Sequence, residues 1–215
     1  DIWFPGADGG DGLGIISLSR ALAESSNQAF VRIANDIGFS TIYDAYLDYG
    51  LYGNNDNMVP SAILGSVETT PLSVAVAYSR VISGKKVQPL FISSVTDRTG
   101  RNLEDNAAAS APDMPGVNSE QTEQIRRMMN DVIIHGTAFS PFKGMDTSNI
   151  CGKTWTSNTV MNSWFAGFSG NIVVVVHIGY DRLRSLGSHE FGSTVAAPVA
   201  AEIIKGLMTD RLTVH

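Results

Sequence analysis

Hydrophobic and polar positions divide this chain into a helix-rich first two thirds and a strand-rich final third. In the first part, apolar residues recur every three to four positions, which predicts amphipathic helices. Polar or glycine-containing segments separate these helices, and Gly38 and Gly50 are typical helix stops. The predicted helices cover residues 18–24, 28–37, 41–49, 70–82, 119–135 and 193–208. The predicted irregular segments cover residues 5–14, 51–65, 106–118 and 136–148.

Three segments near the C-terminus, residues 150–156, 163–168 and 172–180, predict strands. Their short connections favour an antiparallel meander. Another strand is predicted over 87–96, closed by a hairpin turn at 97–100. The last predicted helix carries an apolar stripe that can pack on the meander, made of Val195, Val199, Ile203, Ile204 and Leu207. Helices packed against an antiparallel sheet give an α+β architecture.

Composition narrows the function without defining it. The chain has 215 residues, 43% hydrophobic and 17% charged, which indicates one large domain. A net charge of −6 and the lack of any Lys or Arg run argue against a nucleic-acid partner. One cysteine, Cys151, permits neither an intrachain disulfide nor a cysteine-rich zinc site. The four histidines are widely scattered and form no close-spaced metal pair, so we expect no metal. We also expect no organic cofactor.

Two short motifs suggest chemistry. Ser25-Ser26-Asn27 lies in a turn between two predicted helices, and Lys153-Thr154-Trp155-Thr156 ends the first strand of the meander. Either motif alone is weak evidence, because short polar residues commonly form turns and a Lys-Thr pair usually lies on a solvated strand face.

Together with their surroundings, these motifs resemble the class A penicillin-binding proteins over essentially the whole chain. The segments that carry the resemblance are residues 21–32, 64–72, 77–78, 152–154, 163–168, 176–181 and 195–198. The family motifs are Ser-x-x-Lys, a Ser-x-Asn type triplet and Lys-Thr-Gly. Ser25-Ser26-Asn27 matches the second, and Lys153-Thr154 matches the first two residues of the third, in the expected order. The resemblance implies a single domain over residues 1–215, with an α+β fold like those of penicillin-binding proteins and serine β-lactamases, in which helices flank an antiparallel sheet.

The resemblance also implies residue roles. Ser25 would relay a proton toward the leaving amine, Asn27 would bind the amide of the donor peptide, and Lys153 would supply positive charge. Thr154 and Thr156 would bind the substrate carboxylate, and the N–H of Thr156 would complete the oxyanion hole. The implied parent is a serine D,D-transpeptidase of the bacterial periplasm or the outer face of the cytoplasmic membrane. It would cross-link peptidoglycan stem peptides through an acyl-enzyme, and β-lactams would acylate the same serine.

The Ser-x-x-Lys motif is missing upstream of Ser25. Ser83-Gly84-Lys85-Lys86 matches it in letters, but it follows a predicted helix, contains glycine and comes after the triplet, so we reject it as the nucleophile. We therefore expect the domain to be incomplete at its N-terminus and penicillin not to label these residues alone. The missing part of the same domain, or a complementing chain, is then an expected partner.

Trp155 stands where the family has glycine. Because side chains alternate along a strand, Trp155 should share the face of Lys153, from which substrate approaches. We predict that it narrows the cleft; the alternative is that a twist or bulge turns it outward. The substituted motif and the missing nucleophile favour a rival function, a catalytically inactive module that binds peptide or a partner protein. A third option is a β-lactam sensor domain.

Overall fold

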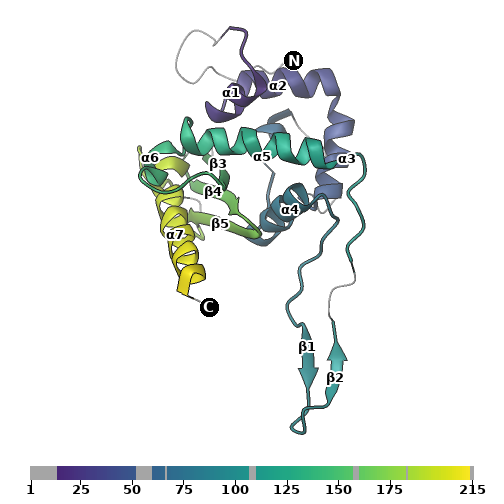
Figure 1. Ribbon diagram of the computed structural model, residues 1–215. Helices are drawn as coiled ribbons and strands as arrows, with labels where there is room; N and C mark the ends of the chain where they lie inside the picture. The colour runs from purple at the N-terminus through teal and green to yellow at the C-terminus, as the bar shows by residue number, and fades with distance from the viewer. Residues whose placement is uncertain are drawn as a thin grey trace.

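The computed structural model describes residues 14–51, 60–65, 67–106, 110–156, 160–182 and 184–213. Helices surround a small sheet, and a hairpin extends far from the body (Figure 1). The predicted irregular loop over 5–14 lies outside the described residues except for Gly14, and so do parts of the predicted loops 51–65 and 106–118. Within the described ranges, no helix combines the length and apolar character needed to cross a bilayer.

The predicted helices of the first part are present, and most begin at a side-chain cap. Ser17, Ser26, Thr70 and Asn118 each accept a hydrogen bond from a backbone N–H in the first turn, which satisfies a donor that the helix leaves unpaired. The helices are α1 (Leu18–Ala23), α2 (Asn27–Ile37), α3 (Phe39–Tyr49), α4 (Pro71–Ser83) and α5 (Ser119–Ile134). Two short elements interrupt the predicted irregular segments, the 3₁₀ turn η1 (Pro60–Leu64) and α6 (Phe139–Phe142).

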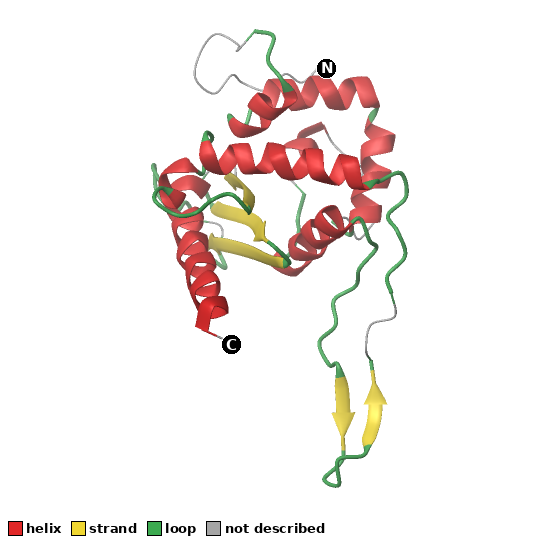
Figure 2. Cartoon of the chain, viewed as in Figure 1, coloured by secondary structure: helices red, strands yellow, loops and turns green. Residues whose placement is uncertain are grey.

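The predicted meander is confirmed. Strands β3 (Ile150–Thr156), β4 (Asn162–Ser169) and β5 (Ile172–Gly179) pair antiparallel in the order β3-β4-β5 (Figure 2). The β3–β4 register runs without interruption from Ile150 opposite Ser169 to Thr156 opposite Ser163. An unbroken register fixes which β3 side chains share a face.

Helices cover both faces of this sheet, which makes the fold α+β as predicted. On one face, Phe165 and Val174 pack with Ile204 of α7 (Ala197–Thr213) in a cluster of buried side chains. On the other face, α4 and α5 contribute the packing, with Val74 against Trp164 and Met129 against Phe168. Lys153 and Trp155 of β3 belong to this second face, because Trp155 packs on Trp164 there.

The C-terminal helix differs from its prediction in the residues it buries. It begins with a π-helical turn, η2 (Gly192–Ala196), before α7. The helix buries a stripe of small residues with one isoleucine, made of Ala197, Ala200, Ala201 and Ile204. Val199 and Ile203 of the predicted stripe are 44% and 42% exposed. Alanines allow the helix axis to approach the sheet closely, so the buried face follows the small residues rather than the large ones.

The predicted strand over 87–96 is too long. Only β1 (Ser94–Thr96) is extended and paired, antiparallel to β2 (Asn102–Asp105) across the predicted hairpin turn. Every residue of both strands is exposed, and the hairpin projects away from the sheet and helices (Figure 1). Its sequence has strand-forming residues, but only one short partner strand pairs with them, and a two-stranded ribbon is only marginally stable.

Candidate functional site

The turn between α1 and α2 presents Ser25 in an unusual backbone conformation. Ser25 has φ 55°, in the left-handed region that costs a non-glycine residue about 1–3 kcal/mol. Two backbone hydrogen bonds hold the turn: Ser25 N–H donates to Leu22 O at 3.2 Å, and Ser26 N–H donates to Ala21 O at 2.9 Å. Strain of this kind concentrates at functional sites, and here it directs the Ser25 hydroxyl toward β3.

Lys153 meets that serine from the strand. Its Nζ donates to Ser25 Oγ and, at 2.9 Å, to the carbonyl oxygen of Thr154. Burial lowers the pKa of Lys153 from 10.5 to about 8, because removal from water disfavours the charged ammonium. A lysine whose pKa approaches neutrality, in contact with a serine hydroxyl, can exchange a proton with it. The structure therefore brings together the two motif residues expected to move protons.

Asn27 is the first residue of α2, two positions after Ser25, and it is half-buried. The Ser26 hydroxyl caps the same helix by accepting from Ala29 N–H at 3.4 Å. The two serines of the triplet therefore have different roles: Ser26 caps the helix, whereas Ser25 contacts Lys153. The role of Asn27 in binding an amide remains a prediction.

The two threonine hydroxyls of β3 lie on the sheet face opposite to Lys153 and have protein partners. Thr154 is buried, 6% exposed, and its Oγ1 lies 2.7 Å from Oγ1 of Thr137. Thr156 Oγ1 accepts from the N–H of Gly192 at 2.9 Å, at the start of η2. Carboxylate binding by Thr154 and Thr156 stays a prediction, and the position of Thr154 favours a contribution from its backbone rather than its hydroxyl.

Trp155 lies on the face of Lys153, as the alternation predicts, and no bulge turns it outward. Its indole stacks on Trp164, with ring centroids 5.1 Å apart and planes 10° apart. Trp164 in turn stacks on His177 at 4.0 Å, so the three rings form a ladder across β3, β4 and β5. On its other side, Trp155 lies beside Gly65, where a Cβ would be 3.8 Å from the indole. The packing keeps this large side chain on the face of the sheet that carries Lys153.

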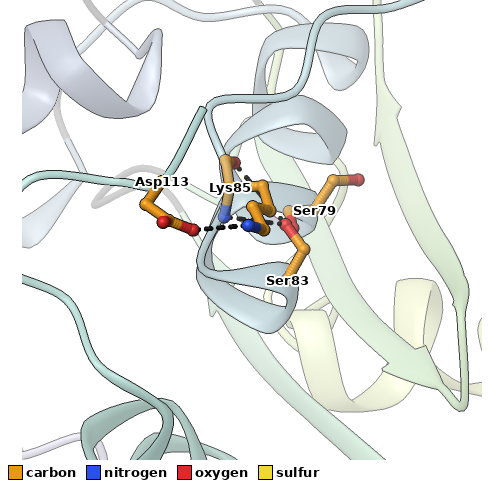
Figure 3. A network of polar contacts seen from close by, with 4 residues as sticks. All are labelled: Ser79, Ser83, Lys85 and Asp113. Atoms are coloured by element: carbon orange, nitrogen blue, oxygen red, sulfur yellow. Dashed lines mark hydrogen bonds and ion pairs between the residues drawn. The ribbon is translucent and has the colours of Figure 1, made fainter. Parts of the chain in front are cut away.

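The rejected pair around Ser83 has different surroundings (Figure 3). Ser83 Oγ donates to Ser79 O at 2.6 Å and accepts from Lys85 N–H at 3.2 Å, both within the turn that ends α4. The Lys85 amine binds Asp113 Oδ1 at 2.5 Å, and the Lys86 amine binds Asp48 Oδ1 at 3.0 Å. Both amines are therefore neutralised by carboxylates instead of contacting the serine, which supports the rejection.

Sequence reasoning missed Thr137. Its backbone N–H donates to Ala23 O at 3.1 Å, and its hydroxyl meets Thr154 of β3. It follows Gly136, where a Cβ would lie 2.5 Å from the Ala23 carbonyl oxygen. The only signal in the sequence is a glycine directly after a helix, which is far too common to identify a site.

Comparison with known proteins gives a consistent result. A family model described as the penicillin-binding protein transpeptidase domain matches residues 4–205. Penicillin-binding protein 1A of Rickettsia bellii is 32% identical, over 97% of this chain and 29% of its own length. Penicillin-binding protein 1A of Neisseria flavescens is 35% identical, over 94% of this chain and 26% of its own length. The chain thus spans little more than a quarter of these curated relatives.

A solved structure supports the same fold. The crystal structure of penicillin-binding protein 1A from Haemophilus influenzae matches with a TM-score of 0.82 and 24% identity, covering 90% of this chain and 34% of that one. The resemblance found in the sequence motifs is therefore confirmed by a family model, by curated relatives and by a solved fold. This chain belongs to the penicillin-binding protein transpeptidase domain family.

Proposed function

We propose that this chain forms the proton-relay and substrate-binding part of a serine D,D-transpeptidase within a longer parent protein. One observation carries the proposal, the contact of the Lys153 amine with Ser25 Oγ where the α1–α2 turn meets β3. Family membership supports peptidoglycan stem peptides as the substrate class. The parent would work in the bacterial periplasm or on the outer face of the cytoplasmic membrane.

The chemistry proceeds in two stages. A serine from a Ser-x-x-Lys segment outside these residues attacks the carbonyl carbon of the D-alanyl-D-alanine amide, and its proton passes to a base. The C–N bond then breaks, and the leaving amine takes a proton from Ser25, which recovers one from Lys153. In the second stage, the amine of another stem peptide attacks the ester carbonyl carbon and gives its proton back to Lys153 through Ser25. The ester C–O bond breaks, the serine oxygen recovers its proton from the base, and the new amide completes the cross-link.

The remaining motif residues would bind the donor peptide. Asn27 would bind the amide group next to the reacting bond, and Lys153 would attract the terminal carboxylate. Thr154 and Thr156 would contribute through their backbone at the edge of the sheet, because their hydroxyls have protein partners on the other face. The N–H of Thr156 would stabilise the negative charge on the tetrahedral intermediate. A β-lactam presents a strained amide to the same groups, so it would acylate the same serine and remain attached.

The packing of Trp155 favours a second candidate function. Its indole is stacked on Trp164 on the face of Lys153, where the family motif has glycine and a substrate backbone would approach. A parent whose cleft is closed by this side chain would bind a peptide or a partner protein without catalysis. The two candidates differ in one measurable property, the formation of a covalent acyl-enzyme.

Acylation of the full-length parent decides between them. We expect intact-mass spectrometry after incubation with a labelled penicillin to show one adduct, and peptide mapping to place it on a serine of a Ser-x-x-Lys segment. The 215-residue chain should show no adduct when it is incubated with the penicillin on its own. Absence of acylation in a folded parent that still binds stem peptide would support the inactive binding module instead.

A further inference from the structure

Thr137 connects the two halves of the site, although it belongs to neither motif. It lies in the loop after α5, and its backbone N–H donates to Ala23 O, two residues before Ser25. Its side chain reaches the other half, where its Oγ1 lies 2.7 Å from Oγ1 of Thr154, the neighbour of Lys153. One residue thus holds both the turn that carries the serine and the strand that carries the lysine.

The loop is built for this close approach. A Cβ on Gly136 would lie 2.5 Å from the Ala23 carbonyl oxygen and 2.9 Å from Val132 Cα, so only glycine lets the loop follow α5 this closely. Ala138, on the other side of Thr137, is completely buried. The loop is therefore fixed at both sides of Thr137, and the threonine has little freedom to move away from Thr154.

The hydroxyl pair is also costly to break. Thr154 is 6% exposed, so its hydroxyl has little access to water if Thr137 loses its own. A buried hydroxyl without a partner is disfavoured, and the strand would shift to find one. Because Lys153 also donates to the Thr154 carbonyl, a shift of Thr154 would move the amine relative to Ser25.

We infer that Thr137 is a positioning residue of the transpeptidase site, which sets the distance between Ser25 and Lys153 through its bonds to Ala23 and Thr154. The inference rests on the proposed function for its catalytic consequence, but its structural part concerns only these contacts. Thr137 touches no reacting atom in this arrangement. It acts by positioning Ser25 and Lys153, which exchange the proton.

The test uses Thr137→Val, Thr137→Ser and Thr154→Val in the full-length parent. We expect Thr137→Val to slow acylation of the folded protein by a labelled penicillin about tenfold, the size of one lost hydrogen bond. Thr137→Ser, which keeps the hydroxyl, should stay within about twofold of the parent. Since Thr137 and Thr154 share one bond, the double valine variant should be no slower than either single variant.

A second readout separates positioning from a general loss of stability. The Lys153 amine faces Ser25 Oγ and the Thr154 carbonyl, and burial lowers its pKa to about 8. NMR titration of the Lys153 side chain should show this pKa rising toward 10.5 in Thr137→Val, because a loosened contact admits water. Thr209→Val serves as the matched control, since the Thr209 hydroxyl bonds only within α7, to Lys205 O at 2.9 Å.

The outcomes are distinct. A lower melting temperature for Thr137→Val, with unchanged acylation of the folded fraction and an unchanged Lys153 titration, would overturn the inference in favour of a structural role. If the parent is not acylated at all, the proposed function fails, and the titration alone still decides the role of Thr137. A rise in the Lys153 pKa with Thr137→Val but not with Thr137→Ser or Thr209→Val supports the inference in either case.

Discussion

The Ser25–Lys153 contact and the Ser83–Lys85 turn use the same two residue types in opposite surroundings. Lys153 donates to a hydroxyl and a carbonyl oxygen, and burial lowers its pKa to about 8. The Lys85 side chain is 47% exposed and binds the carboxylate of Asp113, whose side chain is 79% exposed. An exposed ion pair of this kind contributes little stability, and it holds the Lys85 amine on Asp113 instead of on the serine hydroxyl. The two pairs share their residue types, so it is the burial of the lysine amine beside neutral oxygen atoms that distinguishes a reactive pair from a surface turn.

Replacing the two lysines gives the largest expected contrast. Lys153→Met in the full-length parent should slow penicillin acylation by about 10²–10⁴-fold, the usual contribution of a positioned proton-transfer group. Lys85→Met removes an amine that only binds Asp113, and its acylation rate should stay within about twofold of the parent. Stopped-flow measurements with a labelled penicillin give both rates. Similar losses in the two variants would mean that the Ser25–Lys153 contact has no special role.

Replacing Ser25 and Ser83 by glycine, one at a time, should change the free energy of unfolding in opposite directions, and only the change at Ser25 should slow acylation. Ser25→Gly removes the proposed relay, so acylation should fall about 10²-fold. The same change relieves a φ of 55° and should raise the free energy of unfolding by about 1 kcal/mol. Ser83→Gly, at the end of α4, should leave acylation unchanged and lower the free energy of unfolding by about 0.5–1 kcal/mol. Denaturant titrations measure both free energies, and a loss of stability in Ser25→Gly would contradict the strain at this turn.

The sequence supports prediction where the cause is local, and it fails where the cause is tertiary. Helix caps and alternation placed the Ser25 turn, the three strands and the face of Trp155 correctly. The strand predicted over 87–96 is longer than the observed one, because the β-forming residues there pair with only a short partner strand. The buried stripe of α7 was misassigned because closeness to the sheet selects alanines over larger apolar residues. Thr137 was missed because its role depends on contacts with two segments that only folding brings near.

Trp155 tests whether the buried pair is open to substrate. If its indole narrows the cleft, Trp155→Gly should raise the acylation rate several-fold, equivalent to about 1 kcal/mol of activation free energy. The variant should also lose about 2 kcal/mol of unfolding free energy, because the half-buried indole leaves its stack on Trp164. Trp155→Phe keeps an aromatic ring in the ladder and should change both quantities much less. An acylation rate that does not rise in Trp155→Gly would mean that the indole leaves the cleft open.

Lys153 should also give the stability of the protein a pH dependence that Lys85 does not. Its pKa is lowered from 10.5 to about 8 in the folded protein, so between these values the unfolded chain binds more protons than the folded one. The free energy of unfolding should therefore rise with pH over this window, and Lys153 should add no slope below about pH 8, where both states are protonated.

The measurement compares the parent with Lys153→Met by denaturant titration from pH 7 to about pH 10.5, the ordinary pKa of lysine. Cys151, whose pKa burial raises to about 11, titrates in both proteins and cancels in the difference. Lys85→Met is the matched control, and it should keep the slope of the parent because it retains the buried amine. If the difference between the parent and Lys153→Met stays constant across this range, the amine is not buried as the Ser25–Lys153 contact requires, and the contrast with the Ser83–Lys85 turn loses its basis.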